Sequence, residues 1–155
     1  MKLITILGVR PDIIRLNIII KKLDQLFLKD HVLVNTGQNF DPKLNDIFIQ
    51  ELGVRKPDYH LGVRASNQFE QIGKMMVGLY EVFEKEYPDY VLILGDTNTD
   101  VAAAITARHF RKNNQNGVPV FHMEAGNRSF DARVPEETNR KIVDHISTVN
   151  MAYTH

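Results

Sequence analysis

Short apolar runs alternate with longer amphipathic stretches along this chain, and most of the apolar runs end in glycine or polar residues. Short runs bounded by turn signals are typical of buried strands, whereas apolar residues spaced three and four apart are typical of helices. We therefore predict strands at residues 2–7, 31–35, 58–62, 90–94, 118–122 and 149–153. Helices are predicted at residues 11–27, 44–52, 68–87, 99–111 and 136–146, and a polar loop at residues 112–117.

Strands that alternate with helices predict a parallel sheet joined by right-handed crossovers. The expected fold class is α/β, a Rossmann-like doubly wound parallel sheet, and 155 residues suffice for one such domain. Sheets of this kind bind their ligands at the carboxyl ends of the strands. The polar residues that directly follow the predicted strands are therefore the candidates for chemistry.

The first predicted strand is followed by the turn GVRP, residues 8–11. Its glycine permits a tight turn, and the start of the next helix offers free N–H groups and a partial positive charge. Arg10 lies in this turn and Arg15 one turn into the helix, which predicts a pocket for phosphate or a sugar hydroxyl. A helix cap with two solvated arginines is the alternative. The turn lacks the GxGxxG fingerprint, which disfavours a nicotinamide cofactor.

Carboxylates follow two other predicted strands. Asp96 is either a helix N-cap, worth about 1 kcal/mol, or a catalytic acid or base at the sheet edge. His122, a candidate to bind substrate, and Glu124 alternate along one strand, so we expect both to point the same way. Glu124 then leaves the sheet close to Asp96 if the two strands are neighbours. Two carboxylates in one cleft differ in proton affinity, so one site can supply both an acid and a base.

The segment HMEAGNRSFDARVPEETNR, residues 122–140, continues this cluster of charges. Arg128 and Arg140 are candidate substrate-binding residues in it. Glu136 and Glu137 follow a proline at a predicted helix start, where acids are also good capping residues. Because consecutive helical residues point about 100° apart, at most one of these two glutamates should face the cleft.

The sequence offers two other candidate sites. Asp96, His122, Glu124 and His145 could hold a metal ion, but they lack the HExxH type of spacing, and we predict no metal. The loop TGQN, residues 36–39, together with Asp41 either binds a ligand or forms a plain turn.

Composition narrows the function classes. The 19 basic and 19 acidic side chains balance, so neither a nucleic acid nor a membrane surface is expected as a partner. The chain has no cysteine, which excludes disulfides, thiolate metal sites and thiol nucleophiles. We see neither a signal peptide nor a transmembrane run, and we expect a cytoplasmic protein.

Several motifs together resemble one known family. GVRPDIIRL, NTGQNFD, LGVRKPDY, LILGDTNT, HMEAGNRSFDARVPEETNRKIVDH and MAYT resemble, in the same order, the motifs of the non-hydrolysing UDP-N-acetylglucosamine 2-epimerases. The resemblance implies the N-terminal half of an enzyme with two Rossmann-like domains of the glycosyltransferase-B type. Residues 1–155 would be the N-terminal domain, and the C-terminal UDP-binding domain would be absent.

The resemblance also implies a reaction at C2 of a UDP-N-acetylhexosamine. A base removes the C2 proton while UDP leaves C1, and UDP then adds back to the resulting 2-acetamidoglycal as a proton reaches the other face. No cofactor is implied. By position in the motifs, Asp96, Glu124 and Glu136 match the catalytic acids and Arg10 a motif arginine, while Arg15 stands where a lysine is usual. A catalytic histidine and most UDP contacts would belong to the second domain.

Departures from the family pattern include Val9, Asp12, Asn39, Asn98 and Asn127, and Asp41 stands where regulated members carry a glutamine. The forms GQN, GDTN and EAGNRSFDARVPEE look closer to the branch that makes UDP-N-acetyl-L-fucosamine or L-rhamnosamine. Asp41 implies that regulation by a second UDP-sugar is not expected. We expect a homodimer or a complementing C-terminal domain as partner. A glycosyltransferase-B-type transferase and a non-catalytic remnant remain the alternatives.

Overall fold

The computed structural model describes residues 1–38, 51–112 and 115–154. The elements are, in order, β1 (Leu3–Leu7), α1 (Arg10–Phe27), the 3-10 turn η1 (Leu28–Asp30), β2 (His31–Asn35), β3 (Tyr59–His60), α3 (Gln68–Glu86), β4 (Tyr90–Leu94), α4 (Asn98–His109), β5 (Arg111–Lys112), β6 (Gln115–Asn116), β7 (Val120–Met123), α5 (Pro135–Ile146) and β8 (Val149–Met151). The predicted helix at residues 44–52 lies mostly outside the described residues, as do Asn39 and Asp41.

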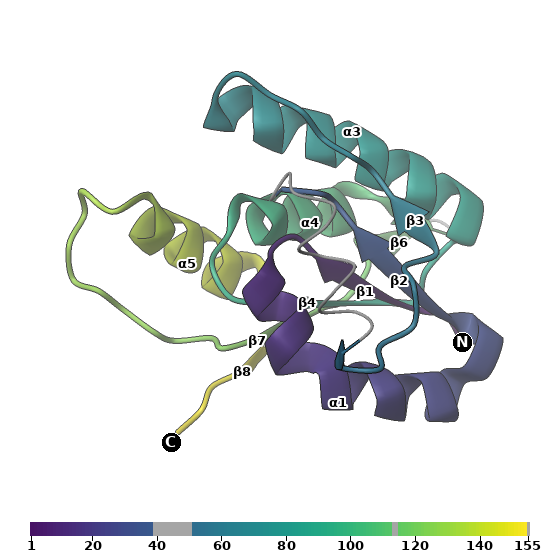
Figure 1. The fold of residues 1–155 in the computed structure, drawn as a ribbon. Helices are drawn as coiled ribbons and strands as arrows, with labels where there is room; N and C mark the ends of the chain where they lie inside the picture. The colour runs from purple at the N-terminus through teal and green to yellow at the C-terminus, as the bar shows by residue number, and fades with distance from the viewer. Residues whose placement is uncertain (39–50, 113–114, 155) are drawn as a thin grey trace.

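Six of the strands form one parallel sheet in the order β3-β2-β1-β4-β7-β8. This confirms the predicted α/β doubly wound fold. The order reverses between β1 and β4, and in open α/β sheets this switch point is where ligands bind. One face of the sheet carries α1, and the other carries α3, α4 and α5 (Figure 1).

The predicted polar loop at residues 112–117 is wrong in part, because β5 and β6 form a small antiparallel hairpin there. Strands of two polar residues show no alternation of apolar and polar positions, so the pattern could not indicate them. The Lys112 ammonium group fixes the hairpin by donating to Asp89 Oδ1 at 2.6 Å and to the Tyr87 carbonyl at 2.7 Å.

The helices pack as their apolar spacing predicts. In α1, Ile13, Leu16 and Ile20 are at most 1% exposed and form a core layer with β1 and β2. In α3, Gly73 and Gly78 do not interrupt the helix. A Cβ at Gly78 would lie 3.1 Å from the Leu61 side chain, so this glycine lets α3 approach the chain beside β3.

The larger core layer lies between the sheet and the helices α3, α4 and α5. In α4 the alanines 102, 103, 104 and 107 are completely buried. Their small side chains let α4 pack closely between α3 and α5, with which it shares its main helix contacts. The start of α4 is thereby fixed against the sheet at the switch point.

The opposite face of the sheet is only partly covered. A hollow of about 530 Å³ lies beside α1, lined by apolar side chains of β1, β4, β7 and β8 as well as the helix. Leu92, Phe121 and Met151 are among these side chains. Within the described residues, no helix is both long and apolar enough to cross a membrane.

Candidate active site

The two carboxylates predicted to share a cleft do follow neighbouring strands. β4 and β7 pair in parallel, with Leu94 opposite Met123. Asp96 comes two residues after β4, and Glu124 directly follows β7. The two strands are therefore neighbours, as the predicted proximity of Asp96 and Glu124 requires.

Asp96 is held by α5 rather than by the helix that follows it. Arg140 Nη2 lies 2.5 Å from Asp96 Oδ2, and Asn139 Nδ2 donates to the Asp96 carbonyl at 2.9 Å. The alternative that Asp96 is a helix N-cap is wrong, because α4 begins after Thr97 and Asp100 accepts from the Thr97 amide at 2.8 Å. The Asp96 carboxylate is therefore available for chemistry beside a cation.

Glu124 leaves the strand in an uncommon backbone conformation. Its φ is +66°, and β7 ends one residue earlier, so the expected alternation of His122 and Glu124 along one strand is wrong. Arg15 Nη1 donates to the Glu124 carboxylate, and Tyr153 Oη donates to it at 3.3 Å. The Glu124 charge raises the pKa of Arg15 above its ordinary value. Glu124 thus faces the start of α1.

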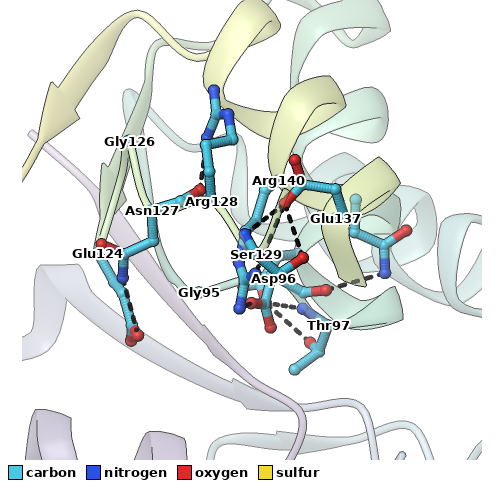
Figure 2. Close-up of polar contacts among 12 residues, drawn as sticks. Gly95, Asp96, Thr97, Glu124, Gly126, Asn127, Arg128, Ser129, Glu137 and Arg140 are labelled. Carbon is cyan, nitrogen blue, oxygen red and sulfur yellow. Dashed lines mark hydrogen bonds and ion pairs between the residues drawn. The ribbon is translucent and has the colours of Figure 1, made fainter. Parts of the chain in front are cut away.

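The two glutamates at the start of α5 differ, as their spacing predicted. Glu137 is 2% exposed and accepts from the Ser129 amide at 2.8 Å, which lowers its pKa. Its Oε2 also lies 3.8 Å from Arg140 Nη1, so Arg140 lies between Glu137 and Asp96 (Figure 2). Glu136 is exposed. The assignment of Glu136 as a catalytic acid stays a prediction, and the acid that shares a cation with Asp96 is Glu137.

The predicted substrate-binding residues differ in exposure and in their contacts. Arg10 is exposed at the first residue of α1, and half of the Arg15 side chain is exposed. Arg128 Nη1 lies 2.5 Å from Asp144 Oδ2. His122 is completely buried, and its Nε2 donates to the Gly95 carbonyl at 2.7 Å. Their contacts with substrate stay predictions.

The switch point is tightly packed and acidic. A Cβ at Gly8 would lie 2.1 Å from Thr99 Oγ1, so the starts of α1 and α4 touch. Asp12 and Asp100 cap these two starts and are almost completely buried. Burial raises the pKa of Asp12 to about 6. Burial and the neighbouring Asp12 charge raise the pKa of Asp100 well above its ordinary value.

One expectation for the first turn is therefore wrong. The Gly8 and Val9 amides donate to Asp12 Oδ2 at 2.8 and 3.0 Å, so they are not free to bind an anion. Any phosphate at this turn would depend on the arginine side chains. The departure at Asp12 carried a signal for this role, since an acid in the first turn of a helix is a common cap.

Sequence reasoning missed three residues that shape the site. Asn139 and Asp144 lie on α5, and Tyr153 follows β8, so each is far in sequence from the residue it contacts. A signal was available for Asp144, which comes one helical turn after Arg140 and shares its side of the helix. For Asn139 and Tyr153 we find no signal in the sequence. Within the described part of the chain, no group of three acidic or histidine side chains is arranged to hold a metal ion.

The chain resembles known proteins over most of its length. Residues 21–155 match the family model described as UDP-N-acetylglucosamine 2-epimerase. The chain is 41% identical over 149 residues to a UDP-N-acetylglucosamine 2-epimerase of Methanococcus maripaludis, an alignment that covers 96% of this chain and 38% of that protein. It is 38% identical to a UDP-2,3-diacetamido-2,3-dideoxy-D-glucuronate 2-epimerase of Pseudomonas aeruginosa, over 96% of this chain and 40% of that protein.

A solved structure agrees with the fold as well. The crystal structure of a UDP-GlcNAc 2-epimerase from Methanocaldococcus jannaschii, in complex with UDP-GlcNAc and UDP, superimposes with a TM-score of 0.90 at 41% identity. The match covers 99% of this chain and 41% of that one. The chain therefore spans about 40% of the length of the relatives it matches.

Proposed function

The chain belongs to the UDP-N-acetylglucosamine 2-epimerase family, and we propose that it is the N-terminal Rossmann-like domain of an enzyme that inverts C2 of a UDP-N-acetylhexosamine. The activity requires a C-terminal domain that supplies most of the UDP contacts. The observation that carries the proposal is the pair of acids at neighbouring strand ends, Asp96 and Glu124, each in contact with an arginine.

The chemistry follows from what the reaction has to move. A base takes the C2 proton, the C1–O bond to UDP breaks with its electron pair, and a double bond forms between C1 and C2. In the return step UDP oxygen attacks C1 while an acid delivers a proton to the opposite face of C2. Two carboxyl groups in one cleft can serve as this base and this acid.

We assign these two roles to Asp96 and Glu124, with Glu136 as a third acid. The leaving diphosphate gains negative charge as the C1–O bond breaks, and cations at the cleft stabilise that charge. Arg10 and Arg15 at the first turn are the cations we assign to it. Arg140 keeps Asp96 beside a positive charge throughout.

The proposed substrate class is a UDP-N-acetylhexosamine. Which sugar of this class the enzyme converts is a separate question. One relative carries the name of a UDP-N-acetylglucosamine epimerase and another that of an epimerase of a UDP-linked diacetamido-glucuronate. The departures in the motifs favour a 6-deoxy sugar. Turnover of a panel of UDP-sugars that contains all three classes would identify it.

The deciding experiment is deuterium incorporation. The chain, fused to the remaining part of the M. jannaschii relative, is incubated with a UDP-N-acetylhexosamine in deuterated water. Epimerisation places deuterium at C2 of both epimers. A sugar that is transferred to an acceptor while C2 keeps its proton would instead identify a transferase.

A binding measurement distinguishes a non-catalytic remnant from an epimerase and from a transferase. Titration calorimetry of the same fusion with UDP and with the UDP-sugar gives measurable heats if the site is functional. Absence of both binding and deuterium incorporation would identify a non-catalytic remnant and refute the proposal.

A further inference from the structure

Asp144 lies on the third turn of α5. Its contacts join the turns that carry Glu124 and Asp96, which the proposed reaction needs at fixed positions. Its side chain is only 11% exposed. Its Oδ2 lies 2.5 Å from Arg128 Nη1, and both of its oxygens accept from the Gly126 amide at 3.2 Å. One carboxylate therefore holds both ends of the short segment that follows Glu124.

His122 extends this connection to the neighbouring strand. Its buried ring lies between two acceptors: Nε2 donates to the Gly95 carbonyl at 2.7 Å, and Nδ1 lies 3.0 Å from Asp144 Oδ1. This second contact is not a linear hydrogen bond, and among the described residues Nδ1 has no other polar partner. Most buried polar atoms have a hydrogen-bond partner, and Asp144 Oδ1 is the acceptor beside this one. Asp144 and Gly95 thus meet the same ring from two sides.

The two turns linked in this way are not ones that a chain adopts unaided. Glu124 has φ +66°, Gly126 has φ +83° and Gly95 has φ +99°. A non-glycine residue in the left-handed region persists only where its surroundings hold it. The contacts of Asp144 and His122 contribute to those surroundings, because they hold Gly126 after Glu124 and Gly95 directly before Asp96.

We infer that Asp144 and His122 form a positioning clamp that fixes the turns carrying Glu124 and Asp96 relative to each other. Neither residue is proposed to touch the reacting atoms. The clamp gives the buried His122 a role other than the substrate contact that the sequence indicated. Its importance for catalysis rests on the proposed function, whereas its effect on the two turns does not.

The test compares Asp144→Asn with Asp131→Asn. Asp131 lies in the segment between β7 and α5 and also pairs with an arginine, Arg133, but its side chain is more exposed, at 36%. Asparagine keeps the size of the side chain and removes the charge that both Arg128 and Gly126 meet. In the 155-residue chain, amide hydrogen exchange at Gly126 is expected to become about 10-fold faster in the Asp144 variant. The Asp131 variant is expected to match the wild type.

Kinetics of the fusion protein provide the second readout. Misplaced acids lower turnover rather than affinity, so we expect Asp144→Asn to reduce kcat about 10- to 100-fold with little change in KM. Unchanged exchange at Gly126, or a kcat equal to that of Asp131→Asn, would overturn the inference. A wild-type fusion without epimerase activity would refute the proposed function, and the exchange measurement would still decide whether the clamp exists.

Discussion

Arg140 Nη2 lies 2.5 Å from Asp96 Oδ2, and the adjacent Asn139 donates to the carbonyl of the same aspartate. Two consecutive residues of α5 thus hold both the carboxylate and the backbone of the residue that follows β4. Figure 2 shows Arg140 reaching from α5 toward Asp96 while Glu124 lies apart, on the side of Asn127. α5 is consequently a part of the site and more than a cover for the sheet.

Arg140→Met should therefore lower activity more than Lys141→Met, which removes the neighbouring cation. The change leaves Asp96 and Glu137 without the charge they share, and in partly buried sites such a loss costs on the order of 2 kcal/mol or more, about 30-fold in kcat/KM. Lys141→Met is the matched control, since Lys141 pairs with Glu137, and with no other acid among the described residues, and its side chain is 59% exposed. Steady-state kinetics of the fusion protein measure both. Equal effects of the two variants would contradict the bridging role of Arg140.

Arg15→Met should weaken the reaction, whereas Arg15→Lys should largely preserve it. Arg15 donates to Glu124, and a hydrogen bond between charged groups contributes about 10-fold or more to a rate that depends on it. Lysine keeps the charge, and the resemblance of the motifs implies lysine as the usual residue at this position. The measurement is again kcat/KM of the fusion protein. If lysine were as damaging as methionine, the contact would depend on guanidinium geometry rather than on charge.

Gly8→Ala should destabilise the fold, and Gly73→Ala should stabilise it. A Cβ at residue 8 would overlap the Thr99 side chain, which costs about 1–3 kcal/mol in a packed site. A Cβ at residue 73 meets nothing within 4 Å, and alanine in an exposed helix is about 0.5–1 kcal/mol better than glycine. Urea unfolding of the 155-residue chain gives both values. A Gly8→Ala variant at least as stable as the wild type would refute the close contact between α1 and α4.

Asp12→Asn should flatten the pH dependence of stability in weakly acidic solution. The unfolded chain releases this proton near pH 3.8, whereas the native chain keeps it to about pH 6. Between these values the native state binds more protons, so the free energy of unfolding falls as pH rises, by on the order of 3 kcal/mol. Asparagine keeps an acceptor for the Gly8 and Val9 amides and has no proton to release.

Thermal or urea unfolding between pH 4 and pH 7 measures this effect. Asp100 lies beside Asp12 and contributes in the same direction, because its pKa is also raised. Asp131→Asn serves as the control, since Arg133 lowers the pKa of that exposed carboxyl and its removal should leave the fall in place. An Asp12→Asn profile that coincides with the wild type would show that the native chain does not retain the proton.

The fold was predictable because its strands are short, apolar and sharply bounded. The strands predicted at residues 31–35 and 90–94 have the observed limits. Alternation of strands and helices leaves few arrangements open, and the right-handed crossover rule selects among them. The hairpin of β5 and β6 escaped this reasoning because its strands are too short to carry a pattern.

The sequence indicated the acids of the candidate site. It did not indicate which residues contact them. Asp96 and Glu124 stand out because each lies within two residues of the end of an apolar strand. The pairing of Arg140 with Asp96 joins residues 44 positions apart, and the clamp of His122 by Asp144 joins a strand to a helix. Such contacts depend on how α5 packs against the sheet, which one sequence does not reveal. The left-handed backbone at Glu124 likewise follows from these contacts and not from local preference.

The conformation of Glu124 also has an evolutionary consequence. Selection for stability alone would favour glycine at this position, because glycine tolerates a positive φ without strain. In the proposed function, a glutamate there supplies an acid at the cost of a strained backbone. We expect homologues that have lost the activity to replace this residue early. The amino acid at position 124 would then distinguish active homologues from inactive ones.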